Sequence, residues 1–272
     1  MSEGAASTYS VSVIVPAHNE EATIAAVLQR VRSAVRGLKE IIVVDDGSRD
    51  TTCRRVEELG LAEVRLIRQP RNHGKTAAVR RALREVTGDI VVIQDADLEL
   101  DPGELDGVIA PIVAGRADCV YGSRFLGKDR TSAPSLAHYL ANRALTQFSN
   151  VLTGANLTDI ETCYKVFRAP LLKEMPITSA GYGMEVEITA TITKTEARIC
   201  EVPISYFPRT REQGKKISVS DGVAALWYLF FYNVVAPRTA RRRLYIKRAN
   251  IFLDQCRGAA PPSLGSQAGT RN

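Results

Sequence analysis

The feature that most restricts the fold of this chain is a regular alternation of strand and helix patterns between residues 11 and 122. Apolar, β-branched stretches that predict strands occupy residues 11–15, 40–46, 63–69, 89–94 and 117–123. Stretches with apolar side chains at helical spacing lie between them, at residues 20–35, 48–60, 74–86 and 102–115. Strict alternation is typical of a mostly parallel sheet with helices on both faces, so we predict an α/β, Rossmann-like fold. Ligands of such sheets bind at the carboxyl ends of the strands.

The second half of the chain is less regular, which predicts a mixed α+β unit. We expect strands at residues 163–168 and 197–208, and helices at 135–154, 181–195 and 218–235. These elements complete one domain over residues 10–250, made of a first half (10–122), an α+β half (123–220) and a C-terminal amphipathic helix with a basic segment (221–250). The polar residues 1–9 and the Gly-, Pro-, Ser- and Ala-rich residues 251–272 are predicted to be disordered.

Composition restricts the partners only in part. The net charge of +6 suits an anionic substrate or an anionic membrane surface. Much of the excess lies in residues 236–250, which could lie on a membrane or form a solvated turn after a packed helix. No nucleic-acid recognition module accompanies the charge, so we expect no nucleic-acid partner. The five scattered cysteines lack metal-ligand spacing and predict reduced thiols in a cytoplasmic protein. No uncharged apolar run reaches the length of about 18 residues expected of a membrane-spanning helix.

Polar segments follow four of the predicted strands: "PAHNEEAT", "DDGSRDT", "DADLE" and "GSRFLG". Because the carboxyl ends of parallel strands share one edge of a sheet, we expect these segments to lie together. Asp46 could accept hydrogen bonds from a base or a ribose, or it could cap the following helix; for Asp45 the two interpretations are equally balanced. No GxGxxG follows the first strand, which argues against a nicotinamide or flavin site.

The segment "DADLE" predicts a metal site. Asp95, Asp97 and Glu99 occupy alternate positions after a buried strand, so they can share a face. Three neighbouring carboxylates repel one another unless a cation neutralises them, and Mg²⁺ or Mn²⁺ prefers oxygen ligands together with substrate phosphates. Without metal we expect a loosely ordered segment, and Glu99 could instead begin the following helix as a favourable N-terminal charge. A solvated acidic loop is the alternative to a metal site.

Basic residues near the same edge could bind phosphates. Lys75 begins a predicted helix, whose N-terminus favours anions. Arg124, Arg209 and Lys215 lie in the predicted loops of the second half, whereas Arg211 and Lys216 are expected to be solvated. The glycine spacing around Lys75 does not match a Walker motif.

With these motifs in order, the chain resembles glycosyltransferase family 2, which has a GT-A fold. The segments that carry the resemblance are "VSVIVPAHNEEATI", "IIVVDDGSRDTT", "DADLELDP", "VYGSRFLG" and "TDIETCYKVFR". The resemblance extends over residues 11–235 and is strongest to the dolichol- and polyprenol-phosphate mannosyl- and glucosyltransferases. Many relatives carry transmembrane helices at the C-terminus, and this chain departs from them there.

The resemblance implies an inverting transferase that uses a nucleotide-sugar and Mg²⁺ or Mn²⁺. It implies that residues 10–122 bind the donor and residues 123–220 the acceptor. The donor-binding residues that we predict are Pro16, Ala17, Asn19, Glu20, Asp46, Lys75, Asp95, Ala96, Arg209 and Lys215. The predicted metal ligands are Asp95, Asp97 and Glu99, of which Asp97 is the first choice. The predicted catalytic residues are Asp97, Arg124, Asp159 and Glu185.

The acceptor is not determined by these residues. A polyprenyl phosphate at the cytoplasmic membrane face arrives already anionic, whereas a soluble hydroxyl acceptor requires a carboxylate base. Asp159 and Glu185 are the candidates for that base, and Asp159 could instead order the acceptor loop with Thr162 and Lys165. A non-catalytic nucleotide-sugar-binding protein is a third alternative. The nucleotide, the sugar and the oligomeric state stay open.

Overall fold

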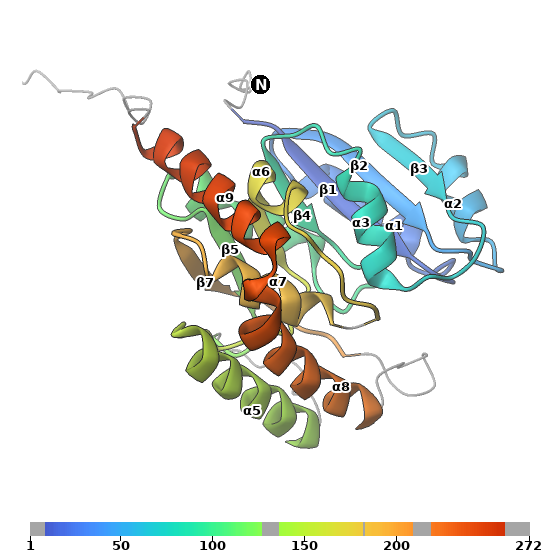
Figure 1. Cartoon of the computed structure of the whole chain (residues 1–272). Coiled ribbons are helices and arrows are strands. Elements are labelled where there is room, and N and C mark those ends of the chain that lie inside the picture. The colour runs from blue at the N-terminus through green and yellow to red at the C-terminus, as the bar shows by residue number, and fades with distance from the viewer. Residues whose placement is uncertain (1–8, 127–135, 182, 209–218, 259–272) are drawn as a thin grey trace, which may run out of the picture.

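One seven-stranded sheet forms the centre of the protein (Figure 1). The computed structural model describes residues 9–126, 136–181, 183–208 and 219–258. The strands are β1 (Val11–Ala17), β2 (Leu38–Asp45), β3 (Val64–Arg68), β4 (Ile90–Ile93), β5 (Cys119–Ser123), β6 (Lys165–Arg168) and β7 (Ile199–Pro203). Their order is β3-β2-β1-β4-β6-β5-β7, and only β6 runs antiparallel to its neighbours. The predicted α/β fold with a mostly parallel sheet is confirmed.

Helices flank this sheet. They are α1 (Ile24–Ala34), α2 (Thr52–Glu58), α3 (Lys75–Leu83), α4 (Leu105–Val113), α5 (Leu136–Thr153), α6 (Ala169–Lys173), α7 (Met184–Ile192), α8 (Val219–Phe230) and α9 (Ala240–Gly258). All of them except α6 and α9 lie within stretches that the sequence predicts to be helical. Helix α3 packs on β1 and β2, and α4 packs on β5, β6 and β7. The central strands β1 and β4 are rich in β-branched apolar residues because helices cover both faces of the sheet there; every residue of β1 and β4 is buried. One continuous apolar core joins the two halves, as expected of a single domain.

The C-terminal end differs from the prediction. Helix α9 continues to Gly258, so residues 251–258, which were predicted to belong to a disordered tail, are helical. The reason is packing: Tyr245, Ala249 and Leu253 recur at helical spacing and are buried against the body of the protein. Residues 1–8 and 259–272 lie outside the described part of the chain. In the described ranges, no helix has the combination of length and apolar character that crossing a bilayer requires.

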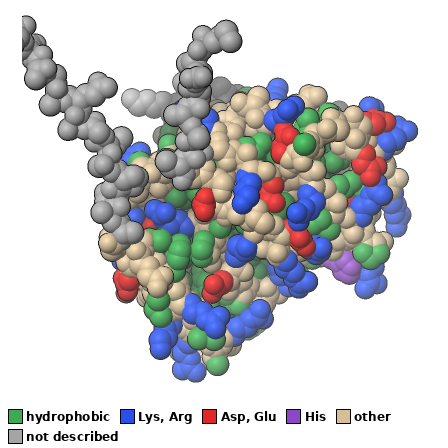
Figure 2. All heavy atoms as spheres, turned by 90° about the horizontal axis from the view of Figure 1, so that it is seen from above, with side chains coloured by type: hydrophobic (Ala, Val, Ile, Leu, Met, Phe, Trp, Pro, Cys, Tyr) green, Lys and Arg blue, Asp and Glu red, His purple; other side chains and the backbone are tan. Residues whose placement is uncertain are grey.

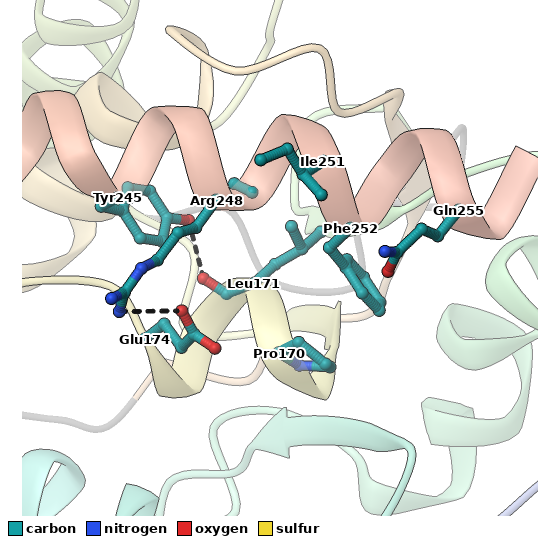
Figure 3. Close-up of a pocket in the computed structure, with 9 residues that line it drawn as sticks. Pro170, Leu171, Glu174, Tyr245, Arg248, Ile251, Phe252 and Gln255 are labelled. Atoms are coloured by element: carbon teal, nitrogen blue, oxygen red, sulfur yellow. Dashed lines mark hydrogen bonds and ion pairs between the residues drawn. The ribbon is translucent and has the colours of Figure 1, made fainter.

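A shallow pocket of about 380 Å³ lies between α6 and α9 (Figure 3). Tyr245 donates a hydrogen bond to the carbonyl of Leu171 at 2.7 Å, and Arg248 lies 4.0 Å from Glu174 across it. Helix α6 follows the end of β6, where Arg168 pairs with the first residue of β4. The pocket is therefore at the amino edge of the parallel strands, opposite the edge where ligands are expected.

Candidate active site

The loops after β1 and β2 are joined to each other by hydrogen bonds. The backbone amide of Asn19 donates to Ser48 Oγ at 2.9 Å, and the amide of Arg49 donates to Asn19 Oδ1 at 2.8 Å. Asn19 adopts a φ of 55°, a left-handed conformation that Asn tolerates better than most residues. Ala17, which ends β1 after Pro16, accepts a hydrogen bond from the amide of Asp46 at 2.8 Å.

Asp46 holds the segment that leads into α3. Its side chain is buried, and its carboxylate accepts hydrogen bonds from the backbone amides of His73, at 2.9 Å, and Gly74, at 2.6 Å. Gly47 beside it has a φ of 71°, and a Cβ there would lie 2.6 Å from the backbone of Arg71, so only glycine fits. The residues of the first two loops that are predicted to bind the nucleotide-sugar thus lie together. Asp46 binds the backbone before α3, which neither a base or ribose contact nor a cap on the following helix predicted.

The acidic segment after β4 is attached to α1 and α3. Thr23 Oγ1 donates to the carbonyl of Ala96 at 2.9 Å and to Glu20 Oε2 at 3.1 Å. Lys75 Nζ lies 2.8 Å from Asp95 Oδ1 and 3.1 Å from Glu185 Oε1, so it forms ion pairs with two predicted site residues. In this structure the ammonium of Lys75 contacts carboxylates, and its predicted phosphate contact stays a prediction.

The three acids have separate surroundings. Asp97 Oδ1 accepts a hydrogen bond from the amide of Glu99 at 3.1 Å, and Tyr206 donates its hydroxyl to Glu99 Oε2 at 3.3 Å. Burial would raise the pKa of Asp95, but the charge and hydrogen bond of Lys75, together with Cys163 and Arg124, lower that pKa. Asp95 is therefore already neutralised by a protein cation, which counts against the expectation of mutual repulsion and a loose segment.

The acids alone do not form a metal centre of three ligands. In the part of the chain that the structure describes, no three His, Cys, Asp or Glu side chains are grouped closely enough to hold a metal ion. Asp97 and Glu99 are partly exposed at the strand end, and each offers only carboxylate oxygen. Such a set suits a hard cation that completes its coordination with substrate phosphates and water. The metal-ligand assignment stays a prediction.

Arg124, in the loop after β5, is held by Asp159. Arg124 Nε lies 2.7 Å from Asp159 Oδ2, and Nη2 lies 2.8 Å from Oδ1, which makes a bidentate pair. Asp159 is fully buried, and although burial alone would raise its pKa, Arg124 lowers it. The guanidinium also lies 5.2 Å from the ring centre of Tyr206. Asp159 is therefore paired with Arg124, a partner that the sequence analysis did not name, and both of its predicted roles stay predictions.

Glu161 is a site residue that the sequence analysis missed. Burial, and then the charge of Glu185, raise the pKa of Glu161 to about 7. A signal was available: Glu161 stands two positions after Asp159, just before β6, whose first residue Lys165 pairs with Tyr121 near the carboxyl end of β5. Two predicted residues, Arg209 and Lys215, and their neighbours Arg211 and Lys216 lie outside the described residues.

The basic segment at residues 236–250 is divided between packing and solvent. Arg242 is buried and forms an ion pair with Glu187. Arg241, Arg243 and Lys247 are exposed on α9. The face seen in Figure 2 mixes basic with acidic side chains, and its Lys and Arg side chains are spread over the surface. Residues 240–250 of this basic segment are therefore part of a packed helix. A packed helix was the alternative to a segment lying on a membrane.

Helices α5 and α8 pack against each other (Figure 1). Both helices expose apolar side chains. The exposed set comprises Leu140, Phe148 and Val151 on α5 and Leu226, Trp227 and Phe230 on α8. Trp227 is 60% exposed, an unusual position for the one tryptophan of the chain. The inner face of α5 borders the site, because Asn142 donates to Asp159 Oδ1 at 3.3 Å.

Comparisons with known proteins agree on the family. The model for "Glycosyl transferase family 2" matches residues 12–175. A hexosyltransferase of low-salt glycan biosynthesis, Agl6 of Haloferax volcanii, is 31% identical over 206 residues, 75% of this chain and 49% of the relative. The dolichol-phosphate mannosyltransferase of Pyrococcus furiosus is 28% identical over 209 residues, 75% of this chain and 58% of the relative. The chain thus spans about half the length of these two relatives.

Solved structures show the same fold. The crystal structure of glucosyl-3-phosphoglycerate synthase from Mycobacterium tuberculosis has a TM-score of 0.65 at 23% identity, over 83% of this chain and 81% of the other. Crystals of that protein contain UDP with Mn²⁺ or Mg²⁺. The GT-A fold that the motifs implied is therefore confirmed.

Proposed function

Because the chain belongs to glycosyl transferase family 2, we propose that it transfers a hexose from a nucleoside diphosphate sugar to a polyprenyl phosphate, with inversion at the anomeric carbon. The names of its relatives support this acceptor class, since the P. furiosus protein acts on dolichol phosphate. The donor is of the GDP-mannose or UDP-glucose type.

One observation carries the choice of acceptor. Asp159 and Glu185, the two carboxylates considered as general bases for a hydroxyl acceptor, are both paired with cations. Arg124 binds both oxygens of Asp159, and Lys75 binds Glu185 Oε1 at 3.1 Å. The pair with Arg124 lowers the pKa of Asp159 against the effect of burial, which makes Asp159 a poor proton acceptor. For Glu185, the ammonium of Lys75 occupies Oε1. A phosphate acceptor needs no proton removed, so this arrangement suits it.

The donor occupies the loops after β1, β2 and β4 in this proposal. The nucleoside contacts Pro16, Ala17, Asn19 and Glu20, while Asp46 holds the adjoining loop in place. Asp97, with Asp95 or Glu99, holds Mg²⁺ or Mn²⁺ on the diphosphate; such a cation stabilises the charge of the leaving group. The metal-bound UDP complexes of the M. tuberculosis protein support this assignment.

Arg124 provides the positive charge on the acceptor side. Its guanidinium side chain is 17% exposed and is oriented by Asp159 and Tyr206. A preorganised guanidinium stabilises phosphate oxygens without paying a large reorganisation cost at the moment of reaction. Arg209 and Lys215 are proposed to contact the donor from the segment outside the described residues.

The membrane is the source of the acceptor in this proposal. The exposed apolar side chains lie on α5 and α8, which pack against each other, and the inner face of α5 borders the acceptor loop. Apolar side chains on such helices bind a bilayer interface by burying that surface. The exposed Arg241, Arg243 and Lys247 of α9 add attraction to anionic lipids. We propose a peripheral location on the cytoplasmic membrane face.

The test is transfer from radiolabelled nucleotide-sugars to polyprenyl phosphate in detergent with Mn²⁺ or Mg²⁺. We expect labelled product in the organic phase with one or two donors, and none when EDTA is present. Product with a soluble hydroxyl acceptor only would overturn the acceptor, and product in EDTA would overturn the metal. Absence of product with UDP-, GDP- and dTDP-sugars, together with absence of donor binding, would overturn the function as a whole.

A further inference from the structure

The segment before β6 is fixed on both sides of Glu161. Glu201 accepts hydrogen bonds from the backbone amides of Thr158, at 2.8 Å, and Asp159, at 3.1 Å. Lys165 Nζ donates to the carbonyls of Ile160, at 2.7 Å, and Thr162, at 2.6 Å. These bonds leave the backbone of the segment little freedom, so the position of the Glu161 side chain is set in advance.

Two carboxylate oxygens in this region are buried without a hydrogen bond. Glu161 Oε1 and Glu185 Oε2 have no hydrogen-bond partner among the residues that the structure describes. Glu185 is 5% exposed, and only its other oxygen is bound, by Lys75. An unpaired buried acceptor is costly, which indicates that a donor group belongs there. Lys75 Nζ lies 3.1 Å from Glu185 Oε1 and 3.4 Å from the Sγ of Cys163, two positions after Glu161, so the two glutamates lie in one region of the site.

The surroundings select the chemistry of that donor group. A phosphate is excluded because carboxylates repel it. A further cation is disfavoured because Lys75 and Lys165 already lie among these acids, and because no three His, Cys, Asp or Glu side chains gather in the described ranges. Neutral hydroxyl groups remain: they donate hydrogen bonds to carboxylates and need no charge balance. The hexose of the donor is the part of the proposed substrates that presents such groups.

We propose that Glu161 and Glu185 bind hydroxyl groups of the transferred hexose and discriminate between sugars. This inference rests on the proposed function. Lys75 contacts both Asp95 and Glu185, so a sugar bound to Glu185 lies beside Asp95. Lys165 is the positioning residue, because it fixes the two carbonyls on either side of Glu161. A site built to accept a hydrogen bond rejects a sugar that lacks the matching hydroxyl, because its buried carboxylate is then left unpaired.

The test separates the sugar from the nucleotide by titration calorimetry with Mn²⁺. The affinity of the nucleotide-sugar and that of the matching nucleoside diphosphate are measured for wild type, Glu161→Gln and Glu185→Gln. We expect each variant to weaken the nucleotide-sugar about tenfold, the cost of one hydrogen bond to a charged group, and to leave the nucleoside diphosphate within about twofold. Nucleotide-sugars that lack one hydroxyl should identify the hydroxyl that is bound. Removing that hydroxyl should weaken binding to wild type as much as the substitution does, and combining the two changes should cause no further loss of affinity.

Glu58→Gln, which removes an exposed carboxylate of α2, is the matched control and should change neither affinity. Equal weakening of both ligands in Glu161→Gln and Glu185→Gln, with a lowered melting temperature, would assign the two residues a structural role and overturn the inference. Unchanged affinity for both ligands would also overturn it, while the proposed function stood. A wild-type protein that binds neither ligand would overturn the proposed function itself.

Discussion

The guanidinium of Arg124 binds both carboxylate oxygens of Asp159, with Nε 2.7 Å from Oδ2 and Nη2 2.8 Å from Oδ1. The backbone amide of Arg124 also donates to Oδ2, at 3.2 Å. This pair ties the loop after β5 to the segment before β6, two parts of the chain that are 35 residues apart. The pair also lowers the pKa of Asp159, so this carboxylate is better suited to holding Arg124 in place than to accepting a proton. The consequences of removing either partner can be predicted.

Asp159→Asn should destabilise the protein strongly. The substitution leaves the partly buried guanidinium of Arg124 without the fully buried carboxylate that neutralises it, and breaking a buried pair from one side costs up to about 3–5 kcal/mol. The measurement is the free energy of unfolding in urea. Asp106→Asn, which breaks the exposed Arg36–Asp106 pair, is the matched control and should cost no more than about 1 kcal/mol. An equal effect of the two substitutions would show that the bidentate pair does not stabilise the fold.

Most strands and helices could be predicted because they follow from local periodicity. The pairing of strands and of side chains from distant parts of the chain could not. The sequence indicated a strand at residues 163–168, but its antiparallel insertion between β4 and β5 depends on contacts between distant segments. Lys75 shows the same limit. Its place at a helix start suggested phosphate, and only the approach of α7 and the end of β4 brings Glu185 and Asp95 to its ammonium. Glu161 was overlooked because its burial is set by these same non-local contacts.

Lys75→Met should strengthen the binding of Mn²⁺. Lys75 neutralises Asp95 and Glu185 in the protein, and its removal leaves two acids that attract a cation without competition from the ammonium. We expect a dissociation constant for Mn²⁺ roughly tenfold lower, from a charge interaction at a few ångströms. The measurement is the rise of the melting temperature in a Mn²⁺ titration without nucleotide.

Lys75→Met has two controls, one that keeps the positive charge at position 75 and one that removes a positive charge at another position. Lys75→Arg retains the positive charge and should bind Mn²⁺ like the wild type. Lys39→Met removes a cation from β2 that donates a hydrogen bond to the carbonyl of Thr87, away from the candidate site, and should have no effect. Mn²⁺ affinity that falls or stays constant in Lys75→Met would indicate that the metal does not bind beside Asp95.

Glu161 should make stability fall as the pH rises. Burial and then Glu185 raise the pKa of Glu161 to about 7 in the folded protein, above its usual 4.5. The folded state therefore binds more protons than the unfolded state between these values, and stability that is fully present below pH 4.5 is lost as the pH passes 7. The difference in unfolding free energy between wild type and Glu161→Gln should change by on the order of 2 kcal/mol over this window.

The measurement for Glu161 is urea denaturation of both proteins at pH 4.5, 5.5, 6.5 and 7.5. Taking the difference removes the contributions of other titrating groups that the two proteins share. Glu21→Gln is the control: hydrogen bonds from Thr51 lower the pKa of Glu21, so the stability of wild type relative to this variant should not fall as the pH rises. A flat difference for Glu161→Gln would mean that the pKa of Glu161 is the same in the folded and the unfolded protein.

Substitution of the apolar residues of α8 should release the protein from membranes. Trp227 and Phe230 are 60% and 44% exposed, and burying large apolar side chains of this kind at a bilayer contributes up to about 1.5–3 kcal/mol each. Trp227→Ser and Phe230→Ser should therefore each lower partitioning into phosphatidylcholine vesicles by about tenfold in a flotation assay. Leu244→Ser on α9, where the side chain is 51% exposed, should have no effect. If α9 were the anchor instead, binding would require anionic lipid, would fall with salt, and would be unchanged by both substitutions in α8.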